Sequence, residues 1–321
     1  MRKVLAALFW FGVAALPDAA MAQSFPQRPI RLIVPFPAGG PTDIIARLVT
    51  QVMGDRLGQP IVIENRGGAG GVIGTDAVAK AAPDGYTLGL SSSGALALSP
   101  SLQKMPYQST KDLTPITLVA RVPELLVVPS SLPVKNLAEL IALAKSQPGG
   151  LNYASTGPGG MPQLAVELIK SAAKVDIVHV PYAGAAPAMN DLLPGRVQMM
   201  FADVPVELPH VLAGTLRPIA IGSPQRLALL PDVPTMSEAG LNTGAVENWY
   251  GLVGPAKLPA DVLAKLQSAA VEAIHDSEVQ KTLGGLGAIL VGDSPAEFTA
   301  FIDAETAKWA QVIRAAGVKI E

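Results

Sequence analysis

The chain alternates short apolar runs with longer segments in which apolar residues recur every three or four positions. In the first half this pattern predicts strands at 31–36, 61–63 and 86–90, a helix from Thr42 to just before Gly58, and a helix through 76–81. Strands separated by helices at this spacing are typical of a parallel sheet with right-handed crossovers. The first half is therefore predicted to be a doubly wound α/β unit.

The pattern restarts in the second half, with strands at 125–128, 152–154, 175–180, 197–201 and 217–221 and helices at 137–146, 162–172 and 187–193. A strand at 248–253 then precedes helices at 260–268, 277–283 and 295–316. These last helices need a sheet to cover, and the first unit lacks helices for one of its faces. We therefore expect a two-domain α/β chain that crosses back, with 24–124 and 246–321 in domain 1 and 125–245 in domain 2.

The first 22 residues have the features of an export signal. Arg2 and Lys3 form a basic start, an apolar run covers 4–16, and Ala20-Met21-Ala22 matches a small-residue cleavage site. The alternative, a transmembrane anchor, is weaker because the run falls short of the ~20 residues that span a bilayer. The sequence therefore predicts an exported, soluble product that is cut after Ala22.

Composition narrows the classes of function. Charged residues make up 16% of the chain and the net charge is -2. No nucleic-acid partner is expected, because phosphate binding needs a basic stripe. The chain has no cysteine, which removes disulfides, thiolate nucleophiles and cysteine-ligated metals. His179, His210 and His275 have no carboxylate or second histidine at ligand spacing, so no metal site is predicted.

Nucleotide and hydrolase motifs are missing from the sequence. Neither G-x-S-x-G nor a phosphate loop occurs. Gly68, Gly70 and Gly74 fall at i, i+2 and i+6, whereas a dinucleotide fingerprint needs a glycine at i+5. A structural role for these glycines, in tight turns and close helix packing, is as consistent with the sequence as a ligand-binding role. No cofactor is predicted.

Small residues precede three of the predicted helices, at 37–42, 155–160 and 183–186. Unpaired amides and the helix dipole make each helix start an anion site that needs no Arg or Lys. Such loops lie at the carboxyl ends of strands, where open α/β sheets bind ligands. Ordinary capping explains two of them, with Thr42 as N-cap and Pro162 as first-turn proline. Three such loops spread over two domains favour a cleft that holds an anion.

Motifs along the whole mature chain resemble one family. They stand at 35–43 (PFPAGGPTD), 64–71 (ENRGGAGG), 83–88 (PDGYTL), 152–157 (NYASTG), 180–184 (VPYAG) and 232–235 (DVPT). In this order they resemble the Bug family, the extracytoplasmic solute receptors of tripartite tricarboxylate transporters. The resemblance implies a periplasmic two-domain binding fold of type II, with two crossovers. It also implies a small carboxylate ligand held by backbone amides, hydroxyls and ordered water, permease subunits as partners, a monomeric state and no enzymatic activity.

The resemblance and the helix starts together imply a set of ligand-binding residues: Phe36, Ala38, Gly39, Gly40, Thr42, Asp43, Ser92, Ser155, Thr156, Gly157, Ala185 and Asp203. The charge of Asp43 suits the helix dipole but would repel a bound anion, so we expect Asp43 to point away or to act through water. Amino-acid-binding relatives often carry Asp-Asn where this chain has Ala202-Asp203. We therefore expect no recognition of an α-amino group.

Two alternatives stand beside the transport receptor. An orphan receptor of the same fold would present its carboxylate to a sensor protein. A secreted carboxylate-processing enzyme would need Asp43, Asp203 or Glu247, and no His or Cys accompanies these acids in the predicted loops, which disfavours catalysis. Succinate-like, citrate-like and aromatic acids all fit the ligand class.

Overall fold

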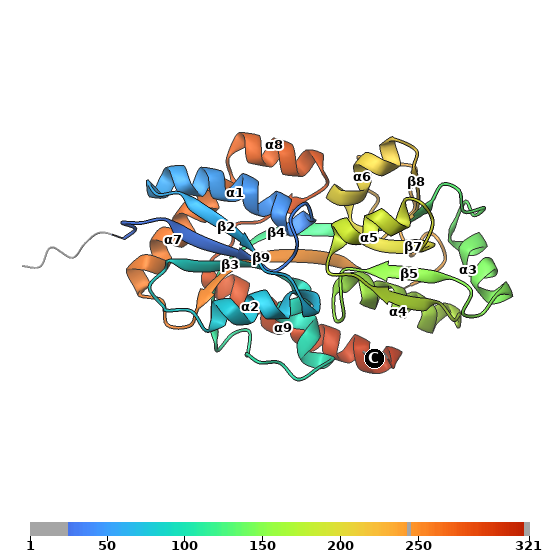
Figure 1. Cartoon of the computed structure of the whole chain (residues 1–321), viewed down its shortest axis with the longest axis horizontal. Coiled ribbons are helices and arrows are strands. Elements are labelled where there is room, and N and C mark those ends of the chain that lie inside the picture. Colours follow the sequence, from blue (N-terminus) through green and yellow to red (C-terminus); the bar gives the residue numbers. More distant parts are fainter. Residues whose placement is uncertain (1–24, 243–244, 318–321) are drawn as a thin grey trace, which may run out of the picture.

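A computed structural model describes residues 25–242 and 245–317 of the chain. Its strands form one mixed sheet in the order β2-β1-β3-β9-β4-β7-β5-β6, with β8 and β10 also paired to β4. Figure 1 shows this sheet running through the long axis of the molecule with helices on both faces. The α/β class predicted from the sequence is confirmed, and the sheet is mixed because β4 and β9 run antiparallel to their neighbours.

The first lobe contains the parallel strands β1 (Ile30–Val34), β2 (Ile61–Asn65) and β3 (Thr87–Ser92). Helix α1 (Pro41–Leu57) follows β1, and α2 (Val72–Ala79) follows β2 after a short turn, η1 (Ala69–Gly71). A π-helical turn η2 (Gly94–Leu98) and a 3-10 turn η3 (Ser99–Ser101) follow β3. Helix α1 ends at Gly58, whose φ of 69° is left-handed and suits glycine.

Two long strands join the lobes. The first part of β4 (Leu113–Pro129) pairs with β9 (Glu247–Pro255), and its last part pairs with β7 (Met199–Asp203) and β8 (Leu216–Ile221). The change of partner occurs near Glu124. There the Gly222 amide donates to the Glu124 carbonyl, at 2.7 Å, and the Val246 amide to the Gly222 carbonyl, at 2.8 Å. The connections between the lobes are thus hydrogen-bonded to one another.

The second lobe contains β5 (Asn152–Ser155), β6 (Val178–Pro181), β7 and β8. Its helices are α3 (Leu137–Ser146), α4 (Met161–Ala173), α5 (Ala185–Leu192) and α6 (Val204–Leu212). Strand β5 pairs in parallel with both β6 and β7. The loops before α4 and α5 therefore lie at the same edge of the sheet.

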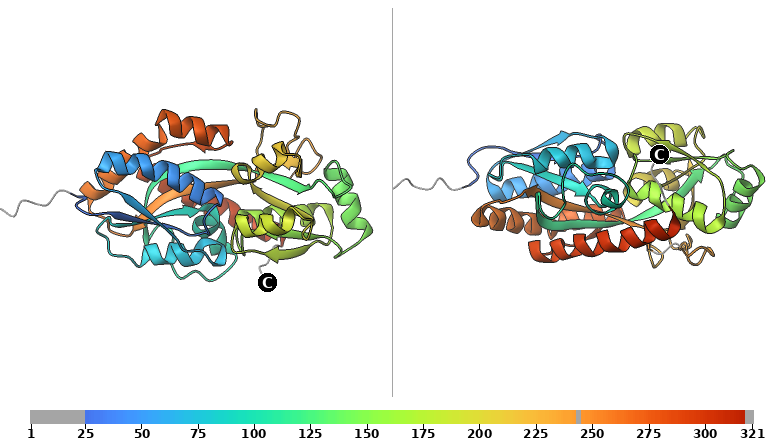
Figure 2. Two further views of the ribbon diagram at one scale, coloured as in Figure 1. Left: turned by 45° about the horizontal axis from the view of Figure 1, so that its top comes forward. Right: turned by 90° about the horizontal axis from the view of Figure 1, so that it is seen from below.

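The last part of the chain covers the first lobe with α7 (Ala260–Ile274), α8 (Ser277–Gly285), β10 (Ile289–Leu290) and α9 (Pro295–Ala316). Helix α7 packs against α1, and α9 lies along β4 on the opposite face and reaches α4 (Figure 2). Trp249, Phe298 and Trp309 anchor α9 in the core. In the described residues no helix is long and apolar enough to cross a membrane. The predicted export signal lies outside these residues.

Two sequence predictions need correction, and one helix was missed. The strand predicted at 125–128 is the end of the 17-residue β4, whose first part contains Pro115 and Pro123. Residues 204–212 form α6, which was not predicted. Thr42 is not the N-cap of α1, because Gly40 holds that position and Pro41 opens the helix. Pro162 does lie in the first turn of α4, as predicted.

Candidate functional site

The two lobes meet through glycine-rich loops at the ends of β1, β2, β5 and β6. A Cβ placed on Gly70 would stand 2.3 Å from the Pro158 carbonyl oxygen, and one on Gly184 would stand 2.8 Å from Cδ of Pro37. Such contacts are shorter than real carbon atoms allow, so the backbones approach this closely only because side chains are missing. We call this region, at 36–43, 68–71, 92–94, 155–160 and 183–186, the interlobe junction.

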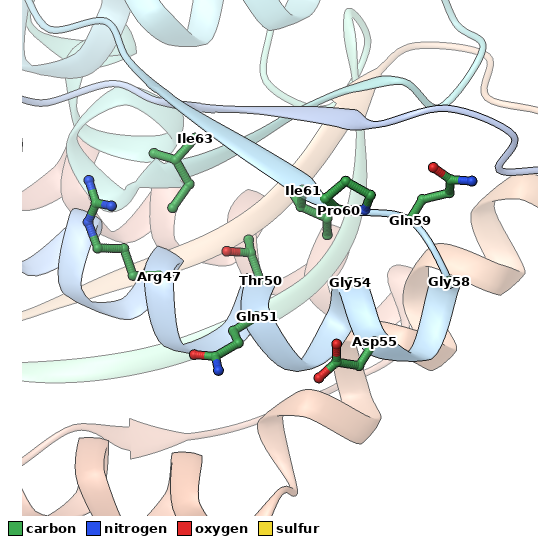
Figure 3. A pocket seen from close by; sticks show the side chains of 10 residues that line it. All are labelled: Arg47, Thr50, Gln51, Gly54, Asp55, Gly58, Gln59, Pro60, Ile61 and Ile63. Carbon is green, nitrogen blue, oxygen red and sulfur yellow. The ribbon is translucent and has the colours of Figure 1, made fainter.

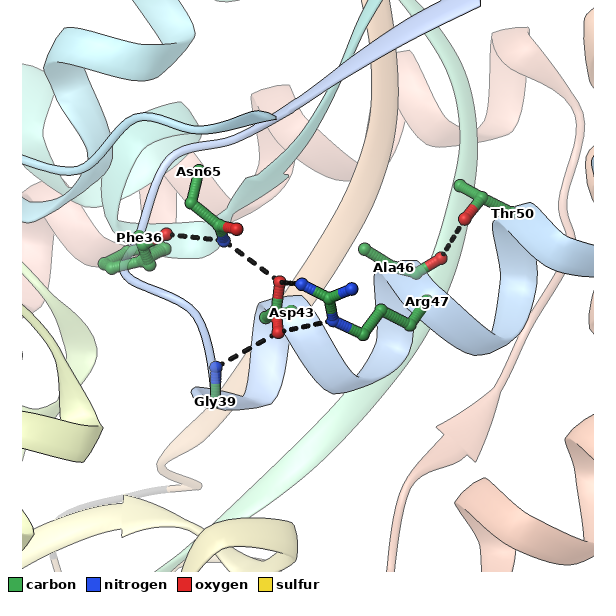
Figure 4. A network of polar contacts seen from close by, with 7 residues as sticks. All are labelled: Phe36, Gly39, Asp43, Ala46, Arg47, Thr50 and Asn65. Carbon is green, nitrogen blue, oxygen red and sulfur yellow. Dashed lines mark hydrogen bonds and ion pairs between the residues drawn. The ribbon is translucent and has the colours of Figure 1, made fainter. Parts of the chain in front are cut away.

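The start of α1 forms the first-lobe wall of the junction (Figure 4). Thr42 and Asp43 are buried there, whereas Ala38 and Gly39 are exposed. The Asp43 carboxylate accepts hydrogen bonds from the Gly39 amide at 3.0 Å, from Arg47 Nε at 2.8 Å and from Asn65 Nδ2 at 3.0 Å. Burial by itself raises the pKa of Asp43, but these hydrogen bonds bring it below its ordinary value. Asp43 is thus turned toward Arg47 and Asn65 within its own lobe.

This arrangement decides which amides of the first lobe are available to an anion. The Gly39 amide donates to Asp43 and is occupied. Pro41 has no amide hydrogen, and the amides of Thr42 and Asp43 have no acceptor inside the helix because they belong to its first turn. Phe36 contributes its carbonyl to Asn65, at 3.0 Å, and places its ring 3.1 Å from the Cβ position of Gly71.

The loop after β5 forms the second-lobe wall. Ser155 is buried, its Oγ lies 2.6 Å from His179 Nε2, and the Gly157 amide donates to that Oγ at 3.2 Å. The other ring nitrogen of His179 lies 3.3 Å from Gln163 Nε2. Thr156 is half-buried beside Ser155, and Ala185 is buried at the start of α5. Sequence reasoning missed the Ser155–His179–Gln163 group because its members lie on three different elements, β5, β6 and α4.

A buried polar network connects side chains of β9 with Ser93, which follows β3, and with Asp203 at the end of β7. Ser93 donates to Asn248 Oδ1 at 2.6 Å, and Asn248 Nδ2 donates to Asp203 Oδ2 at 3.2 Å. The Tyr250 hydroxyl also donates to Asp203. Burial raises the pKa of Asp203 to about 7, and the bonds from Tyr250 and Asn248 only partly oppose that rise. Asp203 therefore links the second lobe to β9. Ser92 is buried at the end of β3, directly opposite Tyr250 in the β3–β9 register.

Two further acids are buried next to Asp203 and were not predicted. Glu124 is its register partner on β4, and Glu207 lies on α6. Both are fully buried, and among the described residues their carboxyl oxygens have no hydrogen-bond partner. Burial, and then the charge of neighbouring acids, holds the pKa of each well above its ordinary value. Burial therefore favours the neutral form of each carboxyl group, and the sequence signal for Glu124 is its place within the largely apolar run of β4, which also carries Arg121.

Outside the junction, a groove of about 730 Å³ lies between α1 and β2 (Figure 3). Its lining includes Arg47, Gln51, Asp55 and Gln59 and comes from α1, β2 and the turn between them. All of its lining residues belong to the first lobe, so the groove does not lie between the lobes. Glu247, the third acid considered for catalysis, is paired with Arg121. In residues 25–242 and 245–317 no cluster of three His, Asp or Glu is placed to hold a metal ion.

Two α/β lobes that are joined by a shared strand and meet through glycine-rich loops define a periplasmic binding protein fold. The family model described as "Tripartite tricarboxylate transporter family receptor" matches residues 45–318. The chain belongs to this family of solute-binding receptors, as the resemblance had indicated. Receptors of this family are periplasmic.

Curated relatives and solved structures agree with this assignment. Protein BugT of Bordetella pertussis is 38% identical over 327 residues, covering 100% of this chain and 99% of that protein. The structure of periplasmic binding protein BugD has a TM-score of 0.89 at 35% identity and covers 92% of this chain and 99% of its own. MatC from Rhodopseudomonas palustris, solved with bound malate, has a TM-score of 0.87 at 36% identity and covers 90% and 100%. An R. palustris protein with adipate has a TM-score of 0.88 at 35% identity and covers 92% and 99%.

Proposed function

We propose that this receptor captures a small carboxylate at the interlobe junction and delivers it to the permease of a tripartite transporter. The observation that carries the proposal is the meeting of helix starts from both lobes, α1 from one and α4 and α5 from the other. Their first-turn amides favour a negative group without a cationic side chain. The relatives solved with malate and adipate support this ligand class.

In the proposed complex one carboxylate lies between the start of α1 and the loop after β5. The amides of Thr42 and Asp43 and the hydroxyls of Thr42, Ser155 and Thr156 are the donors. Asp203 accepts the hydrogen bonds of Tyr250 and Asn248 on Oδ2, and its Oδ1 is buried without a hydrogen-bond partner among the described residues. The proposal of a ligand without an α-amino group rests on the Ala202-Asp203 pair, which stands where amino-acid-binding relatives often carry Asp-Asn.

Closure and export complete the proposal. Residues 24–124 with 246–321 would move as one body and 125–245 as the other, hinged near Glu124, where β4 changes its partner from β9 to β7 and β8. The product would be a periplasmic monomer that is cut after Ala22. An orphan receptor that reports to a sensor protein would use the same ligand site, and binding assays alone do not separate the two roles.

A thermal-shift screen against malate, adipate, citrate and benzoate tests the ligand class. A ligand at 100 times its dissociation constant should stabilise the folded protein by about 2.7 kcal/mol. Chromatography of the same mixtures after incubation separates a receptor from an enzyme, because a receptor returns the acid unchanged. If no acid shifts the transition, or if one is converted, the proposal is wrong.

A further inference from the structure

The hydrogen bonds around His179 form a chain that begins at a backbone amide. The Gly159 N–H donates to Gln163 Oε1 at 2.8 Å, and this fixes which end of the Gln163 amide faces each way. The Gln163 NH2 group is then the end that faces His179 Nδ1, at 3.3 Å. Because an NH2 group can only donate, His179 Nδ1 must accept. In the neutral ring the single proton is therefore on Nε2.

That tautomer determines what the Ser155 hydroxyl can do. His179 Nε2–H donates to Ser155 Oγ at 2.6 Å, and the Gly157 N–H donates to the same oxygen at 3.2 Å. A hydroxyl has two acceptor lone pairs and one proton, so both lone pairs are used. The acceptor near its proton is the Gly157 carbonyl oxygen at 3.4 Å, which is well beyond the ~2.7–2.8 Å of a normal O–H···O bond. The proton is free for a stronger acceptor.

The surroundings hold the imidazole in this orientation. The Tyr153 ring stacks on His179 with centroids 4.8 Å apart and planes 20° apart. The Tyr153 hydroxyl is tied to Glu167 at 2.7 Å, and Glu167 also accepts from Lys170 at 2.8 Å. Glu167 and Lys170 both lie on α4 and form an ion pair with each other. Gln163 is itself buried, at 5% exposure.

We propose that Gln163 and His179 are positioning residues, which act as a relay that fixes the Ser155 hydroxyl as an obligate donor to the ligand carboxylate. This inference rests on the proposed function for its ligand, but the relay itself is a property of the free protein. Each bond in the chain polarises the next, so the terminal hydroxyl is a stronger donor than an isolated serine.

The tautomer can be measured directly. Long-range 1H–15N spectra of the labelled protein distinguish a protonated from an unprotonated ring nitrogen, and His179→Gln assigns the His179 signals among the three histidines of the chain. The relay predicts a proton on Nε2 and none on Nδ1 of the neutral ring. A proton on Nδ1 would overturn it.

Gln163→Glu tests the consequence for binding. An ionised glutamate at position 163 can only accept hydrogen bonds, so it accepts one from the Gly159 N–H and one from His179 Nδ1–H. While the ring is cationic, Nε2 is also protonated and still donates to Ser155. When the ring becomes neutral at higher pH, its remaining proton stays on Nδ1. The unprotonated Nε2 then accepts the hydrogen bond of the Ser155 hydroxyl, which no longer donates to the ligand. Relative to the parent, affinity for the best-binding acid among malate, adipate, citrate and benzoate should fall about ten- to hundredfold between about pH 6 and pH 9.

Controls separate the relay from other causes. Gln147→Glu adds the same charge at an exposed site in the second lobe and should keep the parent's pH profile. In a Ser155→Ala background Gln163→Glu should add no pH dependence, and an undiminished added dependence there would overturn the relay. A parent that shows the predicted tautomer but binds none of the four acids would overturn the proposed function, whereas the other tautomer in a parent that binds would overturn the relay alone.

Discussion

Replacing Gly70 by alanine should block closure of the lobes while leaving each lobe folded. The new Cβ would stand 2.3 Å from the Pro158 carbonyl oxygen, which belongs to the other lobe. A carbon–oxygen contact is normally about 3.3 to 3.6 Å long, so the lobes must separate by about 1 Å at this point. The position also has a φ of 62°, and an L-residue there costs roughly 1–2 kcal/mol.

Gly58→Ala is the matched control. Gly58 also has a left-handed φ, of 69°, but a Cβ there meets nothing within 4 Å. Both variants should lose a similar stability, measured by urea unfolding, because both place alanine in the left-handed region. Only Gly70→Ala should lose ligand affinity, by tenfold or more, because a separation of about 1 Å breaks at least one hydrogen bond to the charged ligand, worth ~1.5–3 kcal/mol.

Calorimetry with the best-binding carboxylate measures the affinities, and solution scattering measures closure. The parent and Gly58→Ala should become more compact when ligand is added, whereas Gly70→Ala should change less. If Gly70→Ala binds as tightly as Gly58→Ala, then contact between the lobes at Pro158 has no part in binding and the closure reasoning is refuted.

Other predictions follow from the same contacts. Thr156→Ala should weaken carboxylate binding about ten- to hundredfold in calorimetry by removing one donor to a charged group, and parent-like binding would place the site elsewhere. Because burial raises the pKa of Asp203 from 3.8 to about 7, the folded state holds its proton longer than the unfolded state, so this group makes stability fall as pH rises through that window. Asp203→Asn should reduce this slope in thermal unfolding, and an unchanged slope would contradict the assignment. Relative to the parent, Glu124→Gln should gain stability in urea unfolding as pH rises above 4.5, because the raised pKa of Glu124 makes its ionisation costly in the folded state, and a pH-independent difference would contradict this. Mass spectrometry of the exported product should give a chain beginning at Gln23, and a retained Met1 would rule out cleavage.

The elements predicted best are those with local signals at both ends. The helices at 137–146 and 295–316 match α3 and α9 residue for residue, because Asn136 and Ser294 cap their starts and Gly317 ends the second. By contrast, the first part of β4 carries two prolines, and its pairing with β9 joins residues more than 100 positions apart. No local pattern encodes such pairing.

The candidate site also has parts with a local sequence signal and parts that depend on contacts between distant residues. Helix starts and small-residue loops are local, so the start of α1 and the loop after β5 could be named from the sequence. The Asp43–Arg47 pair is local, because its members stand four positions apart on α1. The bond from Asn65 to Asp43 and the joint burial of Glu124, Asp203 and Glu207 depend on how strands and helices pack, so the sequence could not show them. His179 looked isolated for the same reason, since Ser155 and Gln163 reach it only through the β5–β6 pairing and the position of α4.

The central claim is that the starts of helices in both lobes hold a negatively charged carboxylate. Calorimetric titration of the mature protein with its best-binding acid and with the neutral amide of that acid tests this most directly. The two compounds have nearly the same shape, so charge is the main difference between them. The acid should bind with one molecule per chain and the amide should bind at least tenfold more weakly. Equal affinity for acid and amide would contradict the account.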